Sequence, residues 1–581
     1  MTNPSNSAAT SVAIALAGSG GAGIMTAGNM LLEAAASAGY YALMTRSSGP
    51  QIRGGEAAAM LRIATHPVEC MPAGFDLLAA VDWENVHRFG AEIPLGAGGL
   101  VLGDEAEGAP PAVFTASGAA IAALPLAAIA RGIPGGRPNM VLLGLVGALL
   151  GLPEDAMHEA VSRTLGKRPA ALEPSLAALA AGRSAAGSLQ PFTPLAPPPG
   201  SAAGRWLITG NEAAGLGALQ GGVRFVAAYP ITPATEMLEW LSPSLESVGG
   251  VLVQAEDELA SINMAIGASY GGVPSLTATS GPGLALMLES LGLAVASETP
   301  IVVVDIMRVG PSTGIPTKSE QGDLDIALHG LHGDAPHLVL APNGVGDALA
   351  TTQWAVTLAE SLQCPAIVLS DQFLGQARAV IDRPAAGASP AARDVAAAAA
   401  EGDAPYRRYA LTDSGISPMA IPGTAGVTYT ADGLEHGERG TPSSQFTDHA
   451  AQLDKRLRKL ADHDYGERWA DLEGEGDLAV ITFGSCTGPL REALALAYER
   501  GLAVRLVSLR LLAPAQPARL AAALAGVRKA LVLEQNHSGQ LLRHLKSSFD
   551  LPVPLASLRK PGGQQFNAAE ILRHVVEWSA A

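Results

Sequence analysis

Cysteine is scarce in this chain, and its spacing excludes two kinds of site. The 581 residues contain three cysteines, Cys70, Cys364 and Cys486, and no C-x-x-C motif. A cubane iron–sulfur cluster is held by a set of cysteine thiolates, so this chain cannot ligate one by itself. A disulfide framework is also unsupported, because such frameworks use an even number of cysteines in a short sequence.

Positive charge and long hydrophobic runs are in short supply as well. The formal net charge is −17 and the pI is near 5.2, which argues against nucleic acid or an anionic membrane surface as a partner. The longest apolar run, Met140 to Leu152, is too short and too interrupted by glycine to span a bilayer. Residues 1–11 lack the basic segment of a signal peptide and are expected to form a short disordered lead-in. We therefore expect a cytoplasmic protein.

Three blocks of alternating apolar strands and helical segments make up the chain. We assign domains to residues 1–183, 205–383 and 474–581, joined by a Pro/Ala-rich linker at 184–204 and by a linker with an irregular insert at 384–473. The insert ends in a basic helical segment at 455–459. Apolar strands joined by helical crossovers predict parallel sheets covered on both faces. The predicted fold class is therefore α/β, with three domains built on parallel-type sheets.

Three motifs of the middle block fall at the predicted carboxyl ends of strands, where parallel sheets bind their ligands. These motifs are Tyr229-Pro230-Ile231-Thr232-Pro233, Gln254-Ala255-Glu256-Asp257-Glu258 and Ser280-Gly281-Pro282-Gly283. They outline half of a thiamine-diphosphate site: a turn that presents Thr232, a carboxylate at the start of a helix, and a glycine-rich loop. The residues expected to line the cofactor beside the carboxylate are Tyr229, Pro230, Ile231, Thr279 and Gly281.

Glu258 is our choice for the catalytic carboxylate. Thiamine catalysis needs a carboxylate hydrogen-bonded to N1′ of the aminopyrimidine, because this contact favours the tautomer whose nitrogen removes the C2 proton. Small residues at 259–268 let the helix behind Glu258 pack closely. The alternative for an acid in this position is stabilisation of the helix N-terminus by its charge. That alternative must apply to at least one of Glu256, Asp257 and Glu258.

The other half of such a site is missing from the sequence. No G-D-G or G-D-S followed by an asparagine pair occurs, and there is no P-loop. The segments Gly322-Asp323-Leu324 and Gly346-Asp347-Ala348 lack the required context. The diphosphate and its Mg²⁺ must therefore belong to another chain, and we assign no metal ligand here.

Arg308 directly follows a buried-type strand and begins the segment RVGPSTGIPTKSEQ. A guanidinium at the end of a strand can bind a carboxylate through its planar fork, and Thr232 can add a hydroxyl donor. We predict that these two residues hold the C1 carboxylate of a 2-oxo acid. The alternative to a substrate-binding role for Arg308 is an ordinary ion pair within the loop. Lys318 is a further candidate for substrate binding.

The first predicted strand ends in GSGGAG at 18–23, which formally matches G-x-G-x-x-G. Arg46 stands where an NAD site would have an acid, so NAD is disfavoured and a phosphate of NADP or coenzyme A stays open. The glycine-rich loop at 47–55 adds another cation. The candidates for coenzyme A contact are Gly20, Gly21, Arg46 and Arg53. The alternative is that both loops are tight connections between strand and helix.

These segments resemble the 2-oxoacid:ferredoxin oxidoreductase family, in particular an α subunit with a fused N-terminal γ domain, as in 2-oxoglutarate:ferredoxin oxidoreductases. GSGGAG and RSSGPQIRGG correspond to the γ domain, and YPITPATE through MRVGPSTGIPTKSEQGDL correspond to the pyrimidine-binding domain. The block with ITFGS and LEQNHSGQ resembles a transketolase C-terminal-like domain. The combination of YPITP and GPSTGIPTKSEQ is specific, whereas GSGGAG alone is weak. The family often has GGQG where this chain has Gly20-Gly21-Ala22-Gly23.

The resemblance implies a β subunit that holds thiamine diphosphate, Mg²⁺ and a [4Fe–4S] cluster, in an (αβ)₂ heterotetramer. It also implies ferredoxin as the electron partner and coenzyme A as the acyl acceptor near the γ domain. Thr232 matches the family's substrate-carboxylate threonine, Glu258 its N1′ glutamate and Arg308 a substrate-binding arginine. The implied reaction interconverts 2-oxoglutarate and coenzyme A with succinyl-CoA and CO₂, either oxidatively or in reductive carbon fixation.

Several alternatives stay open at this point. The choice of 2-oxoglutarate rests on the γ–α fusion and on the insert with Asp413 to Pro418, while pyruvate and branched-chain enzymes share the same core. An NADP-dependent oxidoreductase would use the GSGGAG loop but leaves YPITP unexplained. The remaining alternatives are a non-catalytic scaffold subunit and a thiamine decarboxylase that does not use ferredoxin.

Overall fold

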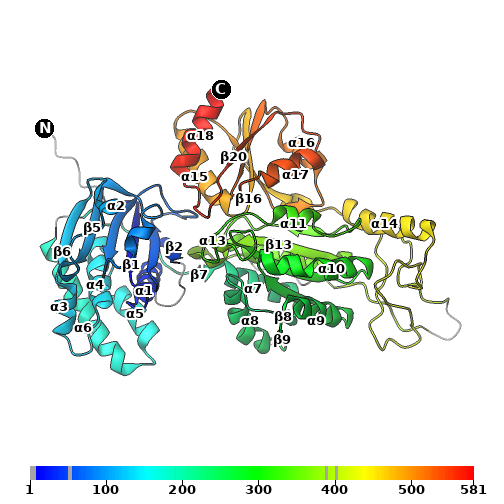
Figure 1. The fold of residues 1–581 in the computed structure, drawn as a ribbon, viewed down its shortest axis with the longest axis horizontal. Helices are drawn as coiled ribbons and strands as arrows, with labels where there is room; N and C mark the ends of the chain where they lie inside the picture. Colours follow the sequence, from blue (N-terminus) through cyan, green and yellow to red (C-terminus); the bar gives the residue numbers. More distant parts are fainter. Residues whose placement is uncertain (1–7, 50–54, 190–191, 386–389, 391, 400–403) are drawn as a thin grey trace. The chain divides into compact units, whose positions relative to one another are not determined.

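The computed structural model describes residues 8–49, 55–189, 192–385, 390, 392–399 and 404–581 (Figure 1). Arg53, residues 1–7 of the expected lead-in and parts of both Ala/Pro-rich segments lie outside the described residues. The chain divides into two compact units. The first contains residues up to 209 together with 376–384 and 567–573, and the second contains 210–375, 385–566 and 574–581.

An eight-stranded sheet in the order β6-β5-β4-β1-β3-β2-β14-β7 forms the first unit. Its strands are β1 (Ser11–Gly18), β2 (Tyr41–Ser48), β3 (Ala57–Ala64), β4 (Phe75–Ala80), β5 (Leu95–Asp104), β6 (Ala120–Leu124), β7 (Arg205–Thr209) and β14 (Arg378–Asp382). The neighbouring strands β1, β4, β5 and β6 are parallel, as strand–helix alternation predicts. β3, however, runs antiparallel to both β1 and β2. Residues 49–56 between β2 and β3 are too few for a helical crossover, so the two strands form a hairpin.

β7 and β14 also join this sheet, and they pair with each other antiparallel. Both lie within the segment 205–383, so the middle block begins and ends on strands of the first sheet. The helices of this unit are α1 (Ile24–Ser37), α2 (Ala112–Thr115), α3 (Leu126–Arg131), α4 (Pro138–Leu150), α5 (Glu154–Leu165) and α6 (Pro169–Ala185). The long apolar run noted in the sequence forms most of α4. Among the described residues, no helix is both long enough and apolar enough to cross a bilayer.

The second unit contains a seven-stranded sheet in the order β18-β12-β13-β11-β10-β8-β9. Its strands are β8 (Phe225–Ala228), β9 (Val251–Gln254), β10 (Ser275–Thr279), β11 (Ile301–Met307), β12 (Leu338–Leu340), β13 (Pro365–Asp371) and β18 (Leu511–Ala513). All are parallel except β18, which pairs antiparallel with β12. The connecting helices are α7 (Gly210–Gly221), α8 (Thr235–Ser247), α9 (Glu258–Tyr270), α10 (Gly281–Ala296), α11 (Leu324–His329), α12 (Val345–Leu362) and α13 (Gln372–Gln376). Every residue of the central strand β11 is buried, which suits its β-branched sequence.

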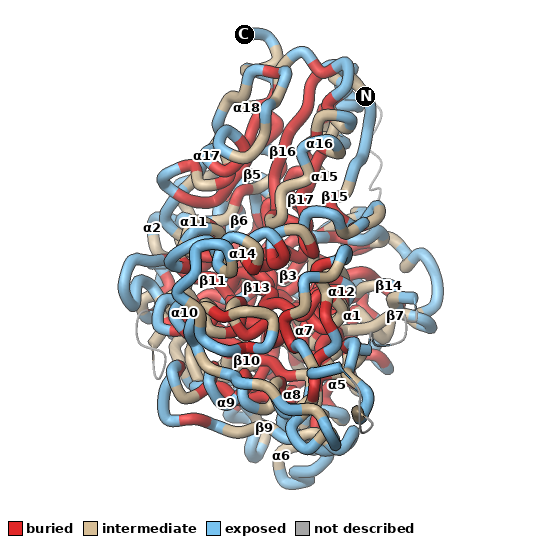
Figure 2. Tube along the Cα trace, turned by 90° about the vertical axis from the view of Figure 1, so that its right-hand side faces the viewer, coloured by how far each residue is buried: buried red, intermediate tan, exposed pale blue. Residues whose placement is uncertain are grey.

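A five-stranded sheet in the order β15-β17-β16-β19-β20 belongs to the same unit. Its strands are β15 (Ala470–Glu473), β16 (Leu478–Phe483), β17 (Arg505–Leu509), β19 (Lys529–Glu534) and β20 (Leu555–Arg559). The helices of this block are α15 (Thr487–Glu499), α16 (Pro517–Ala523), α17 (Gln540–Ser548) and α18 (Ala568–Ala580). Only the edge strand β15 is antiparallel to its neighbour among these described strands. The α/β class with mostly parallel sheets is therefore confirmed, and buried residues follow the strands (Figure 2).

The insert before the third sheet is held by buried charge. Residues 404–445 run in turns and isolated bridges, and the helix α14 (Phe446–Ala461) follows. We expected a basic helical segment near the end of this region. The structure buries its cations Lys455, Arg456 and Lys459. The cationic face of α14 therefore packs inward, the reverse of an ordinary solvated surface helix.

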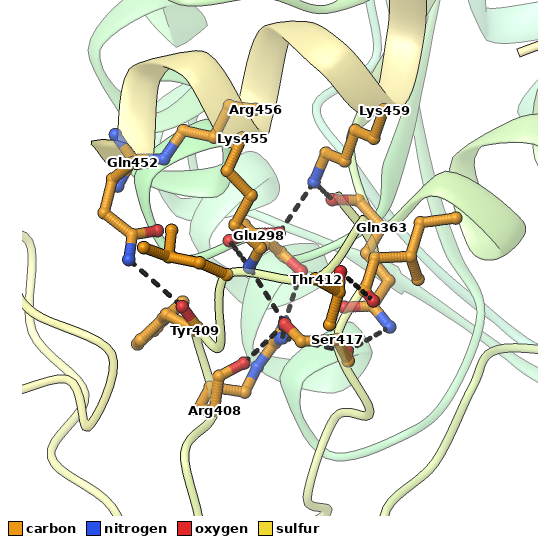
Figure 3. Close-up of polar contacts among 12 residues, drawn as sticks. Glu298, Gln363, Arg408, Tyr409, Thr412, Ser417, Gln452, Lys455, Arg456 and Lys459 are labelled. Atoms are coloured by element: carbon orange, nitrogen blue, oxygen red, sulfur yellow. Dashed lines mark hydrogen bonds and ion pairs between the residues drawn. The ribbon is translucent and has the colours of Figure 1, made fainter. Parts of the chain in front are cut away.

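Glu298 is the counter-charge for this cationic face. It is fully buried just beyond α10, and its two carboxylate oxygens accept from Lys455 Nζ at 2.6 Å and Lys459 Nζ at 2.9 Å (Figure 3). Arg408 of the irregular segment donates through Nη2 to the Glu298 carbonyl oxygen at 2.8 Å. Although burial opposes ionisation, Lys459, Lys455 and Arg408 together hold the pKa of Glu298 well below its usual range. One buried glutamate thus holds both segments, α14 through its carboxylate and the irregular segment through its backbone carbonyl oxygen.

Replacing Glu298→Gln is expected to destabilise the protein by about 3–5 kcal/mol, because two buried ammonium groups lose their anion. Urea unfolding and hydrogen exchange across residues 404–461 measure the loss. Because the folded-state pKa is depressed, this stabilisation is full above the ordinary value of 4.5 and is lost as the pH falls toward the folded-state value. The control Glu438→Gln breaks a surface pair with Arg407 and is expected to cost less than about 1 kcal/mol. Equal losses in the two variants would contradict this account.

Candidate functional site

The strand order brings four loops of the second unit to one edge of its seven-stranded sheet. β9, β8, β10 and β11 are consecutive neighbours and all parallel, so their carboxyl ends face the same way. The turn after β8 carries Thr232, α9 begins at Glu258 after β9, the loop after β10 carries Gly281, and Arg308 follows β11. The sequence-predicted residues of the middle block therefore meet at a single edge.

Thr232 and Arg308 are in direct contact. Arg308 Nη1 donates to the backbone carbonyl oxygen of Thr232 at 2.7 Å. The same turn is held from beneath by Asn211, whose Nδ2 donates to the Pro233 carbonyl oxygen at 3.1 Å. Tyr229 is exposed at the start of the turn, and Pro230 and Ile231 are half-buried. The turn therefore has one side fixed by hydrogen bonds and one side open.

Arg308 is buried, with 7 % of its surface exposed. Its Nε is buried and has no hydrogen-bond partner among the described residues. Burial lowers the pKa of the guanidinium, and the nearby charge of Asp323 opposes that shift. The side chain stays cationic because an arginine does not deprotonate in a protein. A buried, partly unpaired cation of this kind is suited to an anionic ligand.

The three acids at the start of α9 have different environments. Glu256 and Asp257 are exposed, whereas Glu258 is buried with 7 % of its surface exposed. Asp257 caps the helix, because its Oδ1 accepts from the Ala260 amide at 2.7 Å. The helix-terminal role left open by the sequence thus falls to Asp257, and the buried Glu258 packs against Gly283 instead.

Two glycines leave room for the acids at this edge. A Cβ on Gly283 would lie 2.1 Å from Thr279 Oγ1 and 2.8 Å from Glu258 Cγ. A Cβ on Gly281 would lie 2.6 Å from both carboxylate oxygens of Asp323. Any side chain at either position would displace a buried polar group. The glycine loop therefore allows Thr279, Glu258 and Asp323 to approach the start of α10 closely.

Lys318 closes the loop that follows Arg308. The loop turns back on itself through a bridge between Val309 and Ile315, and the Val309 amide donates to the Lys318 carbonyl oxygen at 2.9 Å. The side chain is half-buried, and its Cβ would lie 2.6 Å from a Cβ built on Gly563. Lys318 thus lies in the loop that follows Arg308 and packs against the loop of the third sheet that contains Gly563.

The third sheet supports the segment just beyond Lys318. Gln321 Nε2 donates to the Phe483 carbonyl oxygen at 2.9 Å, and Gln321 Oε1 accepts from the Gln535 amide at 2.9 Å. Asn536 Nδ2 donates to the Gln321 carbonyl oxygen at 3.1 Å. The LEQNHSGQ segment, which the sequence linked only to a family resemblance, therefore holds the end of the loop that follows Arg308.

Asp305 and Asp323 are two residues at this edge that sequence reasoning did not assign. Asp305 is fully buried in β11, opposite Thr279 in the neighbouring strand. Asp323 was noted in the sequence only as lacking a diphosphate-site context. A single acid inside the otherwise apolar strand IVVVDIM was the available signal for Asp305, because an acid is rarely buried without a specific partner.

The N-terminal glycine loop belongs to the first unit, and a carboxylate of the same unit already accepts hydrogen bonds from it. Ser19 donates through its amide at 2.9 Å and through Oγ at 2.8 Å to the Asp82 carboxylate. Gly20 is half-buried, and Gly21 is exposed with a φ of 96°, which favours glycine. Arg46 is exposed on β2, and its Nε donates to Gln376 Oε1 at 3.3 Å. β3 lies between β1 and β2, so it separates Arg46 from the glycine loop.

The residues at the carboxyl edge fit the aminopyrimidine part of thiamine diphosphate. Glu258 supplies a buried carboxylate, Thr279 and the two glycines give a closely packed wall, and the Arg308 fork supplies a cation. Within the described part of the chain, no group of three or more His, Cys, Asp or Glu side chains is arranged to hold a metal ion.

Three family models match successive parts of the chain. The model described as pyruvate ferredoxin/flavodoxin oxidoreductase matches residues 13–185. The model described as pyruvate flavodoxin/ferredoxin oxidoreductase, thiamine diP-bdg, matches residues 216–455. The model described as pyruvate:ferredoxin oxidoreductase core domain II matches residues 476–571.

Individual proteins agree with these models. The α subunit of 2-oxoacid:ferredoxin oxidoreductase 2 of Aeropyrum pernix is 30 % identical, with 97 % of this chain and 98 % of that protein covered. The 2-oxoglutarate oxidoreductase subunit KorA of Mycobacterium tuberculosis is 35 % identical over 75 % of this chain and 67 % of that protein. The solved 2-oxoglutarate:ferredoxin oxidoreductase of Magnetococcus marinus, with 2-oxoglutarate, coenzyme A and succinyl-CoA bound, is 36 % identical, has a TM-score of 0.90, and covers 98 % of this chain and 99 % of that chain. The resemblance predicted from YPITP and GPSTGIPTKSEQ is confirmed, and the chain belongs to the 2-oxoacid:ferredoxin oxidoreductase family.

Proposed function

We propose that this chain is the γ-fused α subunit of a thiamine-diphosphate-dependent 2-oxoglutarate:ferredoxin oxidoreductase, of the 2-oxoglutarate synthase type. The reaction interconverts 2-oxoglutarate, coenzyme A and oxidised ferredoxin with succinyl-CoA, CO₂ and reduced ferredoxin. The contact between Arg308 and Thr232, at the sheet edge where the buried Glu258 begins α9, is the observation that carries this proposal. The substrates bound in the Magnetococcus marinus enzyme support the choice of 2-oxoglutarate.

Glu258 has the role of holding the aminopyrimidine. When bound, thiamine diphosphate would supply a nucleophilic carbon and an electron sink for decarboxylation of the 2-oxo acid. Glu258 would share a hydrogen bond with the ring nitrogen N1′ and so keep the amino group in the state that can accept a proton. Thr279, Gly281 and the turn from Tyr229 to Ile231 would line the ring.

Arg308 and Thr232 orient the substrate. The free edge of the Arg308 fork pairs with the C1 carboxylate of the 2-oxo acid, and the Thr232 hydroxyl donates to the same group. Since Arg308 is anchored on the Thr232 carbonyl oxygen, the two donors keep a fixed separation. Lys318 is the candidate for the distal carboxylate that distinguishes 2-oxoglutarate from pyruvate and from branched-chain 2-oxo acids.

The assembly is part of the proposal. We assign residues 1–183 as the γ domain, 205–383 as the pyrimidine-binding domain and 474–581 as the transketolase C-terminal-like domain, joined by 184–204 and 384–473. A β subunit supplies the diphosphate and Mg²⁺ site and a [4Fe–4S] cluster, in an (αβ)₂ complex that passes electrons to ferredoxin. Gly20, Gly21 and Arg46, with Arg53, contact coenzyme A. The three cysteines are buried and unpaired, which is compatible with the cytoplasmic location that we predict.

The structure of the first unit gives little support to the alternative of an NADP-dependent oxidoreductase. A dinucleotide phosphate uses backbone amides at the start of such a helix, and the Asp82 carboxylate already accepts from the Ser19 amide. The scaffold alternative predicts that Glu258 has no role in the assembled enzyme.

Co-expression with a β-type subunit provides the first test. The complex is expected to reduce ferredoxin or a low-potential dye when 2-oxoglutarate and coenzyme A are both present, with pyruvate and 2-oxoisovalerate assayed in parallel. Activity on another 2-oxo acid alone would replace the substrate assignment and keep the chemistry. A complex that contains thiamine diphosphate and cluster but oxidises none of the three acids would refute the proposal.

Glu258→Gln is expected to lower kcat of the complex by at least about a hundredfold, because the amide cannot act as the proton-linked partner of N1′. The matched control is Glu256→Gln, which makes the same chemical change at an exposed neighbour and is expected to leave kcat within about twofold of the original value. Steady-state kinetics on both complexes, with bound thiamine diphosphate quantified, gives the answer. Equal activities in the two variants would favour the scaffold alternative.

Arg308→Lys is expected to raise KM for the 2-oxo acid by about 10- to 100-fold, since lysine keeps the charge but loses the planar fork. The KM for coenzyme A is expected to stay unchanged and serves as the internal control. A variant with an unaltered KM for the 2-oxo acid would show that the carboxylate binds elsewhere.

A further inference from the structure

The loops at one edge of the third sheet contact a loop of the seven-stranded sheet. β16, β19 and β20 are parallel neighbours, so their carboxyl ends lie at the same edge. Phe483 ends β16, Gln535 directly follows β19, and Gly562 lies in the loop after β20. All three bind residues 319–325, which run from the end of the loop that follows Arg308 into α11. This segment therefore occupies the edge at which a parallel sheet ordinarily binds its ligand.

Side-chain amides bind the backbone of this segment. Three of them donate to backbone carbonyl oxygens: Gln535 Nε2 to Ser319 at 3.3 Å, Asn536 Nδ2 to Gln321 at 3.1 Å and Gln540 Nε2 to Gly322 at 2.8 Å. Gln540 Oε1 also accepts from the Asp325 amide at 2.9 Å. Backbone groups that are removed from water need such partners. The segment is therefore held at several points along its length.

Gln321 is the centre of these contacts and is fully buried. Its Nε2 donates to the Phe483 carbonyl oxygen at 2.9 Å, and its Oε1 accepts from the Gln535 amide at 2.9 Å. Its own backbone amide donates to the Gln535 carbonyl oxygen at 2.8 Å. A glutamine suits this position because its side chain donates at one atom and accepts at the other. A glutamate would place an oxygen without a hydrogen against the Phe483 carbonyl oxygen.

The held segment is connected to Arg308 through a short hydrogen-bonded turn. Ser319 directly follows Lys318, whose carbonyl oxygen accepts from the Val309 amide at 2.9 Å, and Val309 is the neighbour of Arg308. Ser319 Oγ also donates to Asp371 Oδ1 at 3.1 Å, at the end of β13. The base of the loop is thus fixed by its own sheet on one side and by the third sheet on the other.

We propose that the third sheet positions the loop that follows Arg308 through an amide clamp, and that affinity for the 2-oxo acid depends on this clamp. The amide clamp consists of Gln321, Gln535, Asn536 and Gln540. Its effect on the 2-oxo acid rests on the proposed function, whereas its hold on the loop does not. The four amides are positioning residues, because they act through the loop and not on the substrate. The third sheet thereby contributes to substrate binding.

The kinetic test removes one amide donor of the clamp at a time in the assembled complex. Gln321→Glu and Gln540→Glu are each expected to raise KM for 2-oxoglutarate by about tenfold, because a displaced loop binds the carboxylate less well. Both are expected to leave kcat within about threefold of the original value, since the cofactor-side acid is unaltered. A role in folding alone would instead reduce the amount of active complex and leave KM as it was.

The matched control is Gln516→Glu, which makes the same change just before α16. Gln516 is half-buried and its Nε2 donates to the Pro514 carbonyl oxygen at 3.2 Å, away from the loop, so KM is expected to stay within about twofold. If Gln321→Glu prevents assembly, the half-buried Gln540 decides the question. An unaltered KM in the clamp variants that assemble, or a fall in kcat alone, would overturn the proposal.

Hydrogen exchange of the full chain in its complex tests the clamp without any turnover. Gln540→Glu is expected to speed exchange of the backbone amides across residues 309–325, because the segment loses a hydrogen bond that holds it, and Gln516→Glu is expected to leave this region unchanged. Equal exchange in the two variants would overturn the proposal. If the unaltered complex oxidised no 2-oxo acid, the proposed function and the effect on KM would fail, while hydrogen exchange would still report the hold on the loop.

Discussion

The hydrogen bond from Arg308 to the Thr232 carbonyl oxygen joins loops that are 76 residues apart. It forms because β8 and β11 are parallel strands on either side of β10, so their carboxyl ends lie at the same edge. The substrate assignment depends on this bond. Without it, the threonine hydroxyl and the guanidinium would belong to two independent loops and could not define one carboxylate site.

Close packing around two glycines also restricts which residues this sheet edge can hold. Gly283 and Gly281 lie so near Glu258 and Asp323 that any side chain on them would displace these acids. The edge therefore holds a buried acid, Glu258, packed against Gly283, and a partly buried acid, Asp323, packed against Gly281.

Much of this arrangement could be predicted from the sequence. The proximity of Thr232, Glu258 and Arg308 follows from strand–helix alternation, because loops after parallel strands meet at one edge. Glu258 was chosen from the sequence among three adjacent acids, and the structure shows that Asp257 is the one that caps α9. Contacts between distant segments were beyond sequence reasoning. The counter-charge of Lys455 is Glu298, 157 residues away, and β3 runs antiparallel to β2 in a sheet that was predicted to be parallel-type. Asp305 was not assigned from the sequence, although it is a single acid inside the otherwise apolar strand β11 and is fully buried.

The central claim is that this sheet edge holds the aminopyrimidine against Glu258 and the substrate carboxylate against Arg308. A structure of the complex with a β subunit, thiamine diphosphate and 2-oxoglutarate tests it most directly. The account predicts a hydrogen bond between N1′ and Glu258, and a carboxylate paired with the free edge of the Arg308 fork near the Thr232 hydroxyl. A cofactor ring bound away from Glu258, or a substrate carboxylate that does not reach Arg308, would contradict it.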